Sequence, residues 1–239
     1  METSLHRQLK AVYASAAAPQ TEVRLGEYRI DAVRDDATLV EIQHGSLAAI
    51  RTKIAALLAK KYQVLVVKPI IATKTLVKLD ERGGNVVSRR LSPKRGTILD
   101  LFHELIYFTQ VFPHERLVLE VPLVEVEELR YPGHGRRRRW RKNDFVVEDQ
   151  RLVGVLESQR FVTRGDLWQL LPPALPSPFH TGHLAEQAGI ARWVAQRIAY
   201  CLAKTGTARE VGKEGNARLY VGQVCNLPAK KKRTRRKQA

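Results

Sequence analysis

The most informative stretch of the chain is residues 28–43, YRIDAVRDDATLVEIQ. Its two halves alternate apolar and polar residues on either side of an aspartate-rich turn, a pattern that predicts two antiparallel strands. Side chains in a strand alternate between faces, so Glu41 and Gln43 share one face while the apolar residues beside them point into the core. Pairing through the turn then brings Asp31 next to Glu41.

Two neighbouring carboxylates indicate a cation site, because like charges repel each other unless a cation lies between them. Hard cations such as Mg²⁺ take oxygen ligands at about 2.0–2.1 Å. The carboxylates of Asp31 and Glu41 and the backbone carbonyl of Ile42 supply three such oxygens. We therefore expect Mg²⁺ or Mn²⁺ at these three residues, where the metal would activate water and neutralise a phosphodiester under attack.

The segments around this hairpin predict a mixed α/β core. Amphipathic spacing predicts helices, alternating or continuous apolar runs predict strands, and Gly and Pro mark their ends. The expected order is a helix over 3–16, strands over 22–25, 28–33 and 38–43, a helix over 47–59, a strand over 62–67, a hairpin over 71–91, a helix over 98–108 and a strand over 117–129.

The positive charge of the chain is concentrated in two short runs. The 239 residues include 41 Lys plus Arg against 24 Asp plus Glu, a net charge of +17. Residues 136–142, RRRRWRK, and residues 230–237, KKKRTRRK, hold thirteen of the basic side chains, and 17 − 13 leaves +4. Such runs resist folding and bind polyanions, most often nucleic acid, with a solvated loop and tail as the alternative.

We place the domain boundary at the first basic run. The expected division is a first domain over 1–134, a basic linker over 135–145, a second domain over 146–224 and a basic disordered tail over 225–239. Within the second domain we expect helices over 150–156, 164–171, 181–187 and 191–204, then two short strands within 208–221. A helix-turn-helix followed by a two-stranded wing predicts a winged helix, which can bind either DNA or protein.

The motif RID-x9-EIQ, with a helix before it and a helix and the strand VLVVKPI after it, resembles the PD-(D/E)XK nuclease superfamily in an E-x-Q variant. The resemblance covers about residues 3–70 and implies a restriction-endonuclease-like sheet flanked by helices. It makes Asp31 and Glu41 the acidic metal ligands. Gln43 stands where a lysine normally orients the attacking water, and Lys53 on the next helix is a candidate for a migrated lysine.

The whole layout also resembles an uncharacterised bacterial family of nuclease-like proteins. The catalytic residues implied by the resemblance are Asp31, Glu41, Gln43 and Lys53. Basic side chains that we expect to contact nucleic acid are Arg89, Arg90 and Lys94 in a loop, Arg136, Arg137, Arg138 and Arg139 in the linker, and Arg192, Arg197 and Lys213 in the winged helix. By contrast, His180 and His183 have no nearby cysteine or acidic partner, so we expect them to play a structural part.

The function that these features predict is a metal-dependent DNA endonuclease that a winged helix targets to duplex DNA. A catalytically inactive DNA-binding protein on the same fold is the main alternative, because Gln43 lacks the charge of lysine. A third reading is RNA or ribosome association through the basic tail. Since the sequence contains no apolar run of about 18 residues, we expect a soluble cytoplasmic protein, bacterial and nucleoid-associated, with no membrane partner. The sequence leaves open whether the protein forms a homodimer.

Overall fold

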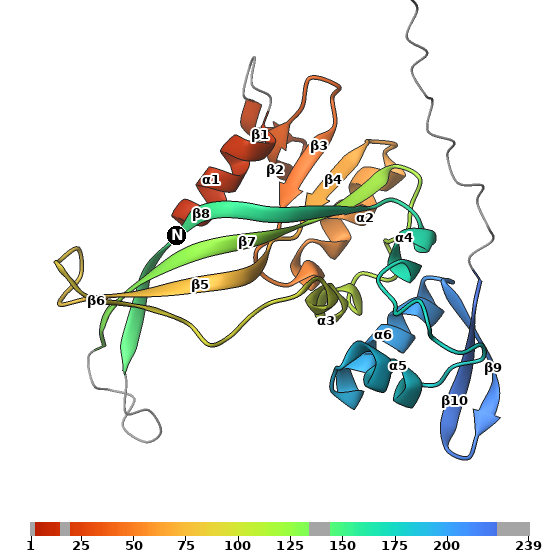
Figure 1. The fold of residues 1–239 in the computed structure, drawn as a ribbon. Helices are drawn as coiled ribbons and strands as arrows, with labels where there is room; N and C mark the ends of the chain where they lie inside the picture. Colours follow the sequence, from red (N-terminus) through yellow and green to blue (C-terminus); the bar gives the residue numbers. More distant parts are fainter. Residues whose placement is uncertain (1–2, 15–19, 134–143, 224–239) are drawn as a thin grey trace, which may run out of the picture.

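A computed structural model describes residues 3–14, 20–133 and 144–223 of the chain. Within these residues an eight-stranded mixed sheet forms the centre of the fold (Figure 1). The elements of this part are α1 (Ser4–Tyr13), β1 (Gln20–Leu25), β2 (Tyr28–Val33), β3 (Leu39–Ile42), η1 (Leu47–Ala49), α2 (Arg51–Ala59), β4 (Val64–Val67), β5 (Ile70–Leu79), β6 (Val86–Leu91), η2 (Ile98–Asp100), α3 (Leu101–Leu105), β7 (Leu117–Pro132) and β8 (Phe145–Phe161).

Strand β7 organises the sheet. One of its edges pairs in parallel first with β4 and then with β5, which follow each other in the chain on either side of Pro69. The other edge pairs with antiparallel β8 along almost its whole length. Strands β3, β2 and β1 extend the sheet beyond β4, and β6 extends it beyond β5. The far halves of β5, β7 and β8 therefore project with β6 beyond the helices (Figure 1).

Both faces of the central strands are covered, as their continuous apolar runs predict. On one face, Leu5 and Leu9 of α1 pack on a buried cluster that includes Val40 and Val126. On the other face, the helices α2 and α3 pack on a second cluster, in which Phe102 is fully buried. The predicted mixed α/β sheet flanked by helices is confirmed.

The C-terminal unit contains three helices and a two-stranded hairpin within the described residues. They are α4 (Arg164–Trp168), α5 (Thr181–Ala188), α6 (Arg192–Lys204), β9 (Ala208–Glu214) and β10 (Ala217–Gly222). An isolated bridge between Phe179 and Tyr220 ties the segment before α5 to the hairpin. The buried face of α6 belongs to the same apolar cluster as Phe102, so the two units share one core.

Two sequence expectations are wrong in this region. The helix expected over 150–156 is part of strand β8, where Val153 and Val155 suit a strand and β7 offers a long unpaired edge. The boundary expected over 135–145 falls between two strands of one sheet, because β8 returns beside β7. The first unit thus continues to Phe161, and the second begins after it.

Candidate functional site

The two predicted acidic residues lie where strands β2 and β3 separate. These strands pair only at Ala32 with Val40 and at Val33 with Leu39. Beyond these pairs, a side chain takes over the role of the backbone, since the Ile42 amide donates a hydrogen bond of 2.8 Å to Asp31 Oδ2. This bond holds the Asp31 carboxylate against the strand that carries Glu41.

Lys53 joins this pair from helix α2. Its ammonium group lies 2.6 Å from Glu41 Oε2 and also donates to the backbone carbonyl of Arg29. Glu41 is buried and Lys53 is half-buried, so the contact is shielded from water. The structure therefore holds Asp31 of β2 against the backbone of β3 and Lys53 of α2 against Glu41 of the same strand.

Helix α1 supplies two side chains that sequence reasoning missed. His6 Nε2 lies 3.4 Å from Asp31 Oδ1, and Lys10 Nζ lies 3.7 Å from the same oxygen. Lys10 also forms an ion pair with Glu22, which in turn pairs with Arg29. The i, i+4 spacing of His6 and Lys10 puts them on one side of α1, a signal that becomes meaningful only once the face of the helix is known.

Asp31 and the two side chains from α1 line an open cavity of about 430 Å³. Its lining residues are Thr3, His6, Lys10, Glu22, Arg29, Asp31 and His44. The cavity therefore has a carboxylate wall beside several cationic or titratable groups. Such a mixture suits a ligand that carries phosphate oxygens and reacts beside a carboxylate.

The pKa values of the two carboxylates are shifted in opposite directions. Burial acts to raise the pKa of Asp31, but hydrogen bonds from His6 and from the Ile42 amide outweigh it, so the pKa is lowered. The pKa of Glu41 is raised, mainly by burial. The hydrogen bond from Lys53 opposes this rise only in part, and the negative charge of Asp31 adds to it. The two environments thus move the pKa values of Asp31 and Glu41 apart, and such perturbed pKa values are common at functional sites.

Gln43 makes a contact within the turn that follows its strand. Its side-chain amide donates a hydrogen bond of 2.9 Å to the carbonyl of Ser46, so it braces the turn between β3 and η1. Lys53 is the side chain that meets Glu41 instead. Alignment of a water by Gln43 stays a prediction.

The oxygen ligands at this site fit a divalent metal that needs only one or two carboxylates from the protein. Across the described residues, no group of three or more His, Cys, Asp or Glu side chains is arranged to hold a metal ion. Mg²⁺, however, commonly binds through one or two carboxylates and completes its shell with water and substrate phosphate. The carboxylates of Asp31 and Glu41 match that pattern, while the part expected of the Ile42 carbonyl stays a prediction.

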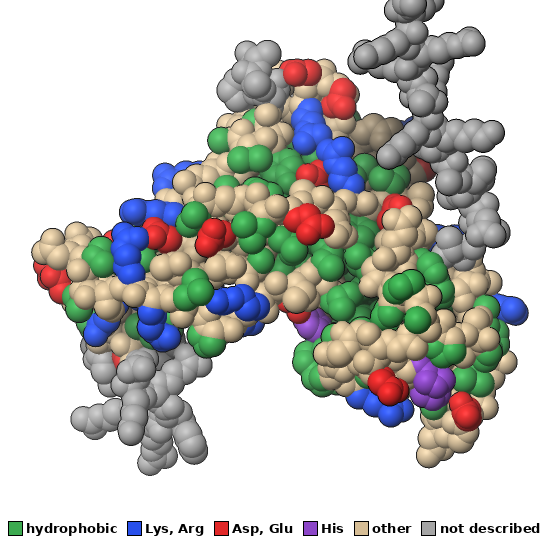
Figure 2. All heavy atoms as spheres, in the orientation of Figure 1, with side chains coloured by type: hydrophobic (Ala, Val, Ile, Leu, Met, Phe, Trp, Pro, Cys, Tyr) green, Lys and Arg blue, Asp and Glu red, His purple; other side chains and the backbone are tan. Residues whose placement is uncertain are grey.

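The basic residues expected to contact nucleic acid are in several environments. Arg89 and Arg90 belong to strand β6, which corrects their expected place in a loop, and Lys94 follows it as an exposed side chain. Figure 2 shows Lys and Arg side chains on the projecting part of the sheet. Arg136, Arg137, Arg138 and Arg139 lie outside the described residues.

In the C-terminal unit, Arg192 and Lys213 are exposed, but Arg197 is half-buried. Arg197 Nη1 lies 3.1 Å from His103 Nδ1, and the His103 ring stacks on Trp193. Arg197 thus contributes to the junction of α6 with α3, which corrects the expectation that it is exposed. His180 Nδ1 accepts hydrogen bonds from the amides of Gly182 and His183 and caps α5, a structural part as expected.

A family described as "Domain of unknown function (DUF8091)" matches residues 3–162. The chain belongs to this family. It is also 31% identical over 220 residues to a protein of Treponema pallidum (strain Nichols) named "Uncharacterized protein", a match that covers 92% of this chain and 84% of the relative. No solved structure matches the chain.

In residues 3–14, 20–133 and 144–223, none of the helices has the length and apolar character needed to cross a membrane.

Proposed function

We propose that the protein is a metal-dependent DNA endonuclease of the PD-(D/E)XK type. The single observation that carries this proposal is the convergence of Asp31, Glu41 and Lys53 from β2, β3 and α2. The order of the elements supports it, since a helix, a hairpin, an acidic strand, a helix and a buried strand follow one another. A restriction-endonuclease-like fold accounts for this order and for the site.

In this mechanism each residue acts through a defined contact. The Ile42 amide fixes Asp31, so the carboxylate is preorganised for a cation. Lys53 can place a positive charge beside the attacking water or the phosphate, as it already does beside Glu41. Mg²⁺ or Mn²⁺, when bound by Asp31 and Glu41, would supply Lewis-acid activation of the phosphodiester. Lys10 and His6 would hold phosphate oxygens in the cavity.

The C-terminal unit is proposed to act as a winged helix that binds duplex DNA. Support comes from the succession of α4, the bridge at Phe179, α5, α6 and the β9–β10 hairpin. The exposed side chains of Arg192 on α6 and Lys213 on β9 would contact DNA. Such a protein would work at the bacterial nucleoid in the cytoplasm, and a homodimer would allow it to cut both strands.

A second candidate function is favoured by one specific observation. Lys53 already pairs with Glu41, and Lys10 lies 3.7 Å from Asp31, so each carboxylate has a lysine beside it. Two lysines in place of a cation suit a protein that kept the fold and lost the chemistry. In that case the protein would be a non-catalytic DNA-binding protein.

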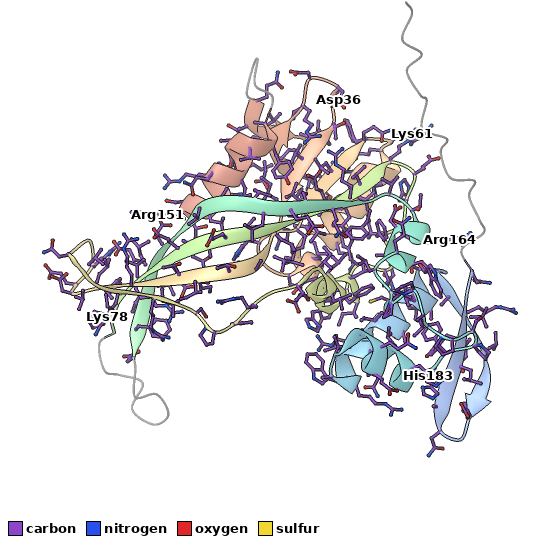
Figure 3. All side chains as sticks on the ribbon, viewed as in Figure 1. Asp36, Lys61, Lys78, Arg151, Arg164 and His183 are labelled. Atoms are coloured by element: carbon purple, nitrogen blue, oxygen red, sulfur yellow. The ribbon has the colours of Figure 1, made fainter. Side chains whose placement is uncertain are left out.

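Cleavage of supercoiled plasmid at low salt with Mg²⁺ or Mn²⁺ tests the nuclease proposal. We expect wild type to nick the plasmid and Asp31→Ala and Glu41→Ala to lose this activity. Asp36→Ala is the matched control, because Asp36 is an exposed carboxylate at the far end of the same hairpin (Figure 3). Equal activity in all four proteins would rule out this site.

Calorimetric titration with Mn²⁺ separates the two candidates. The endonuclease should bind Mn²⁺ in a manner that Glu41→Ala abolishes. Absence of both metal binding and cleavage, with salt-dependent retention of DNA, would favour the non-catalytic protein.

A further inference from the structure

The projecting part of the sheet has one face that carries a net positive charge. We call residues 74–91, 126–132 and 145–152 the β-arm; they comprise most of β5, all of β6 and the paired parts of β7 and β8. Figure 1 shows the β-arm extending beyond the helices, and Figure 3 places Lys78 on it, far from His183 of the C-terminal unit.

The strand register defines which side chains share this face. Lys74 and Lys78 are separated by an even number of residues on β5, so they point the same way. Arg90 is opposite Leu76, and Ser88 and Arg130 are opposite Lys78. Directly opposed residues lie on one face of a sheet, so these cations form one group.

The group lines a hollow and carries net positive charge. Leu76, Lys78, Ser88, Arg90, Arg130 and Phe145 are among the residues around an open cavity of about 400 Å³. Nearby are the cations Lys74, Lys78, Arg90 and Arg130 and the carboxylates Glu128 and Asp144, so 4 − 2 leaves +2. Since Lys78 and Arg90 are exposed, their charges can act on a ligand.

Three contacts hold the partly buried cations Lys74 and Arg130 in place. Glu128 is 3% exposed and accepts bonds from Lys74 at 2.5 Å and from Arg130. Arg130 also lies 3.9 Å above the ring of Phe145, which fixes the plane of its guanidinium group. The basic face is therefore preorganised.

The basic face lies on the side of the sheet that helix α1 covers, and residues of α1 line the Asp31 cavity. Val126, the partner of Lys74 in the ladder, is buried with Leu5 and Leu9 of α1. Burial, and then the charges of Lys68 and Lys74, lower the pKa of His44, which lines the Asp31 cavity. From Lys74 to Lys78 the strand rises about 13 Å, or several phosphate spacings of one DNA strand.

We propose that the basic face of the β-arm is a DNA-backbone track that continues from the Asp31 cavity through Lys74 to Lys78, Arg90 and Arg130. The inference rests on the proposed function for the identity of the ligand and deepens it. The substrate is then a DNA long enough to occupy both the cavity and the β-arm, which gives the hairpin β5–β6 a binding role.

Fluorescence anisotropy with a labelled 30-base-pair duplex, in EDTA and over a range of salt concentrations, tests the track. The double variant Lys78→Ala/Arg90→Ala should bind about tenfold more weakly than wild type, with a salt slope smaller by about 2. The matched control is Lys61→Ala, because Lys61 is an exposed cation after helix α2 and lies far from Lys78 (Figure 3). It should bind as wild type does.

The inference is overturned if the double variant keeps the affinity and salt slope of wild type, or if wild type shows no salt-dependent binding. Thermal unfolding confirms that the variants are folded, and Arg90→Lys should retain binding because it keeps the charge. Wild type that binds through the track but never cleaves would refute the nuclease and leave the track standing. Cleavage by wild type, with unchanged DNA binding by the double variant, would refute the track and leave the nuclease standing.

Discussion

Tyr13 links helix α1 to strand β7 through a buried hydrogen bond. Its hydroxyl donates to Glu120 Oε1 at 3.0 Å, and Glu120 also accepts from Ser158 and Arg160. Burial and the negative charge of Glu120 raise the pKa of Tyr13 to about 12. The folded state therefore keeps the phenol neutral at a pH where the unfolded chain ionises it.

This contact predicts an alkaline stability loss. A raised folded-state pKa gives a contribution that is complete below the unfolded pKa of about 10 and is lost as pH rises towards 12. The free energy of unfolding of wild type should fall relative to Tyr13→Phe by about 1 kcal/mol between pH 9 and pH 11. Urea unfolding of both proteins at both pH values measures the difference; an unchanged difference would show that Tyr13 titrates normally.

At the residue scale, local pattern predicted part of the site. Alternation along the strands was sufficient to place Asp31 beside the strand that carries Glu41, and the family resemblance identified Lys53 as a candidate. His6 and Lys10 could not be predicted, because their proximity to Asp31 depends on how α1 docks on the sheet. The engagement of Gln43 with Ser46 likewise depends on the shape of the turn.

At the scale of elements, β8 shows where periodicity fails. Its residues 150–156, QRLVGVL, satisfy a short helical pattern, but the unpaired edge of β7 is a stronger determinant. Strand β8 is an edge strand with one partner, so many of its apolar side chains stay exposed. Its sequence therefore lacks the alternation of apolar and polar residues that marks a half-buried strand. By contrast, strands β2, β3 and β4 have clear patterns and were predicted correctly.

The turn between α5 and α6 gives a second prediction. Gly189 ends α5 with φ of +62°, and a Cβ there would meet no atom within 4 Å, so only the backbone conformation opposes a side chain. Gly189→Ala should lower the free energy of unfolding by about 1 kcal/mol. Gly212→Ala is the control, since Gly212 on β9 has open space and no positive φ. Chemical denaturation of both variants checks this; equal stabilities would contradict it.

At the scale of the whole molecule, the two units depend on each other. The buried residues of α3 and α6 belong to one cluster, and Cys201 Sγ lies 3.8 Å from the carbonyl oxygen of Phe102. The sequence placed a boundary at the charged run because charge is visible in a sequence, whereas a shared core is not. Contacts between segments about one hundred residues apart cannot be read from local periodicity.

Phe102→Ala tests this dependence. Phe102 is fully buried in the shared cluster, so its truncation should cost about 3–5 kcal/mol and destabilise both units together. Urea unfolding followed by circular dichroism and by tryptophan fluorescence should give coincident transitions, since Trp168 and Trp193 lie in the C-terminal unit. Two separated transitions would mean that the units fold independently.

The central claim is that Asp31, Glu41 and Lys53 form a nuclease site in which Lys53 serves in place of Gln43. The most direct test compares single-turnover nicking of plasmid by wild type, Lys53→Ala and Gln43→Ala. We expect Lys53→Ala to lose at least a hundredfold in rate, in the range of a lost electrostatic group, and Gln43→Ala to stay within a few fold. Nicking that survives in Lys53→Ala but is lost in Gln43→Ala, or no nicking by wild type, would contradict the claim.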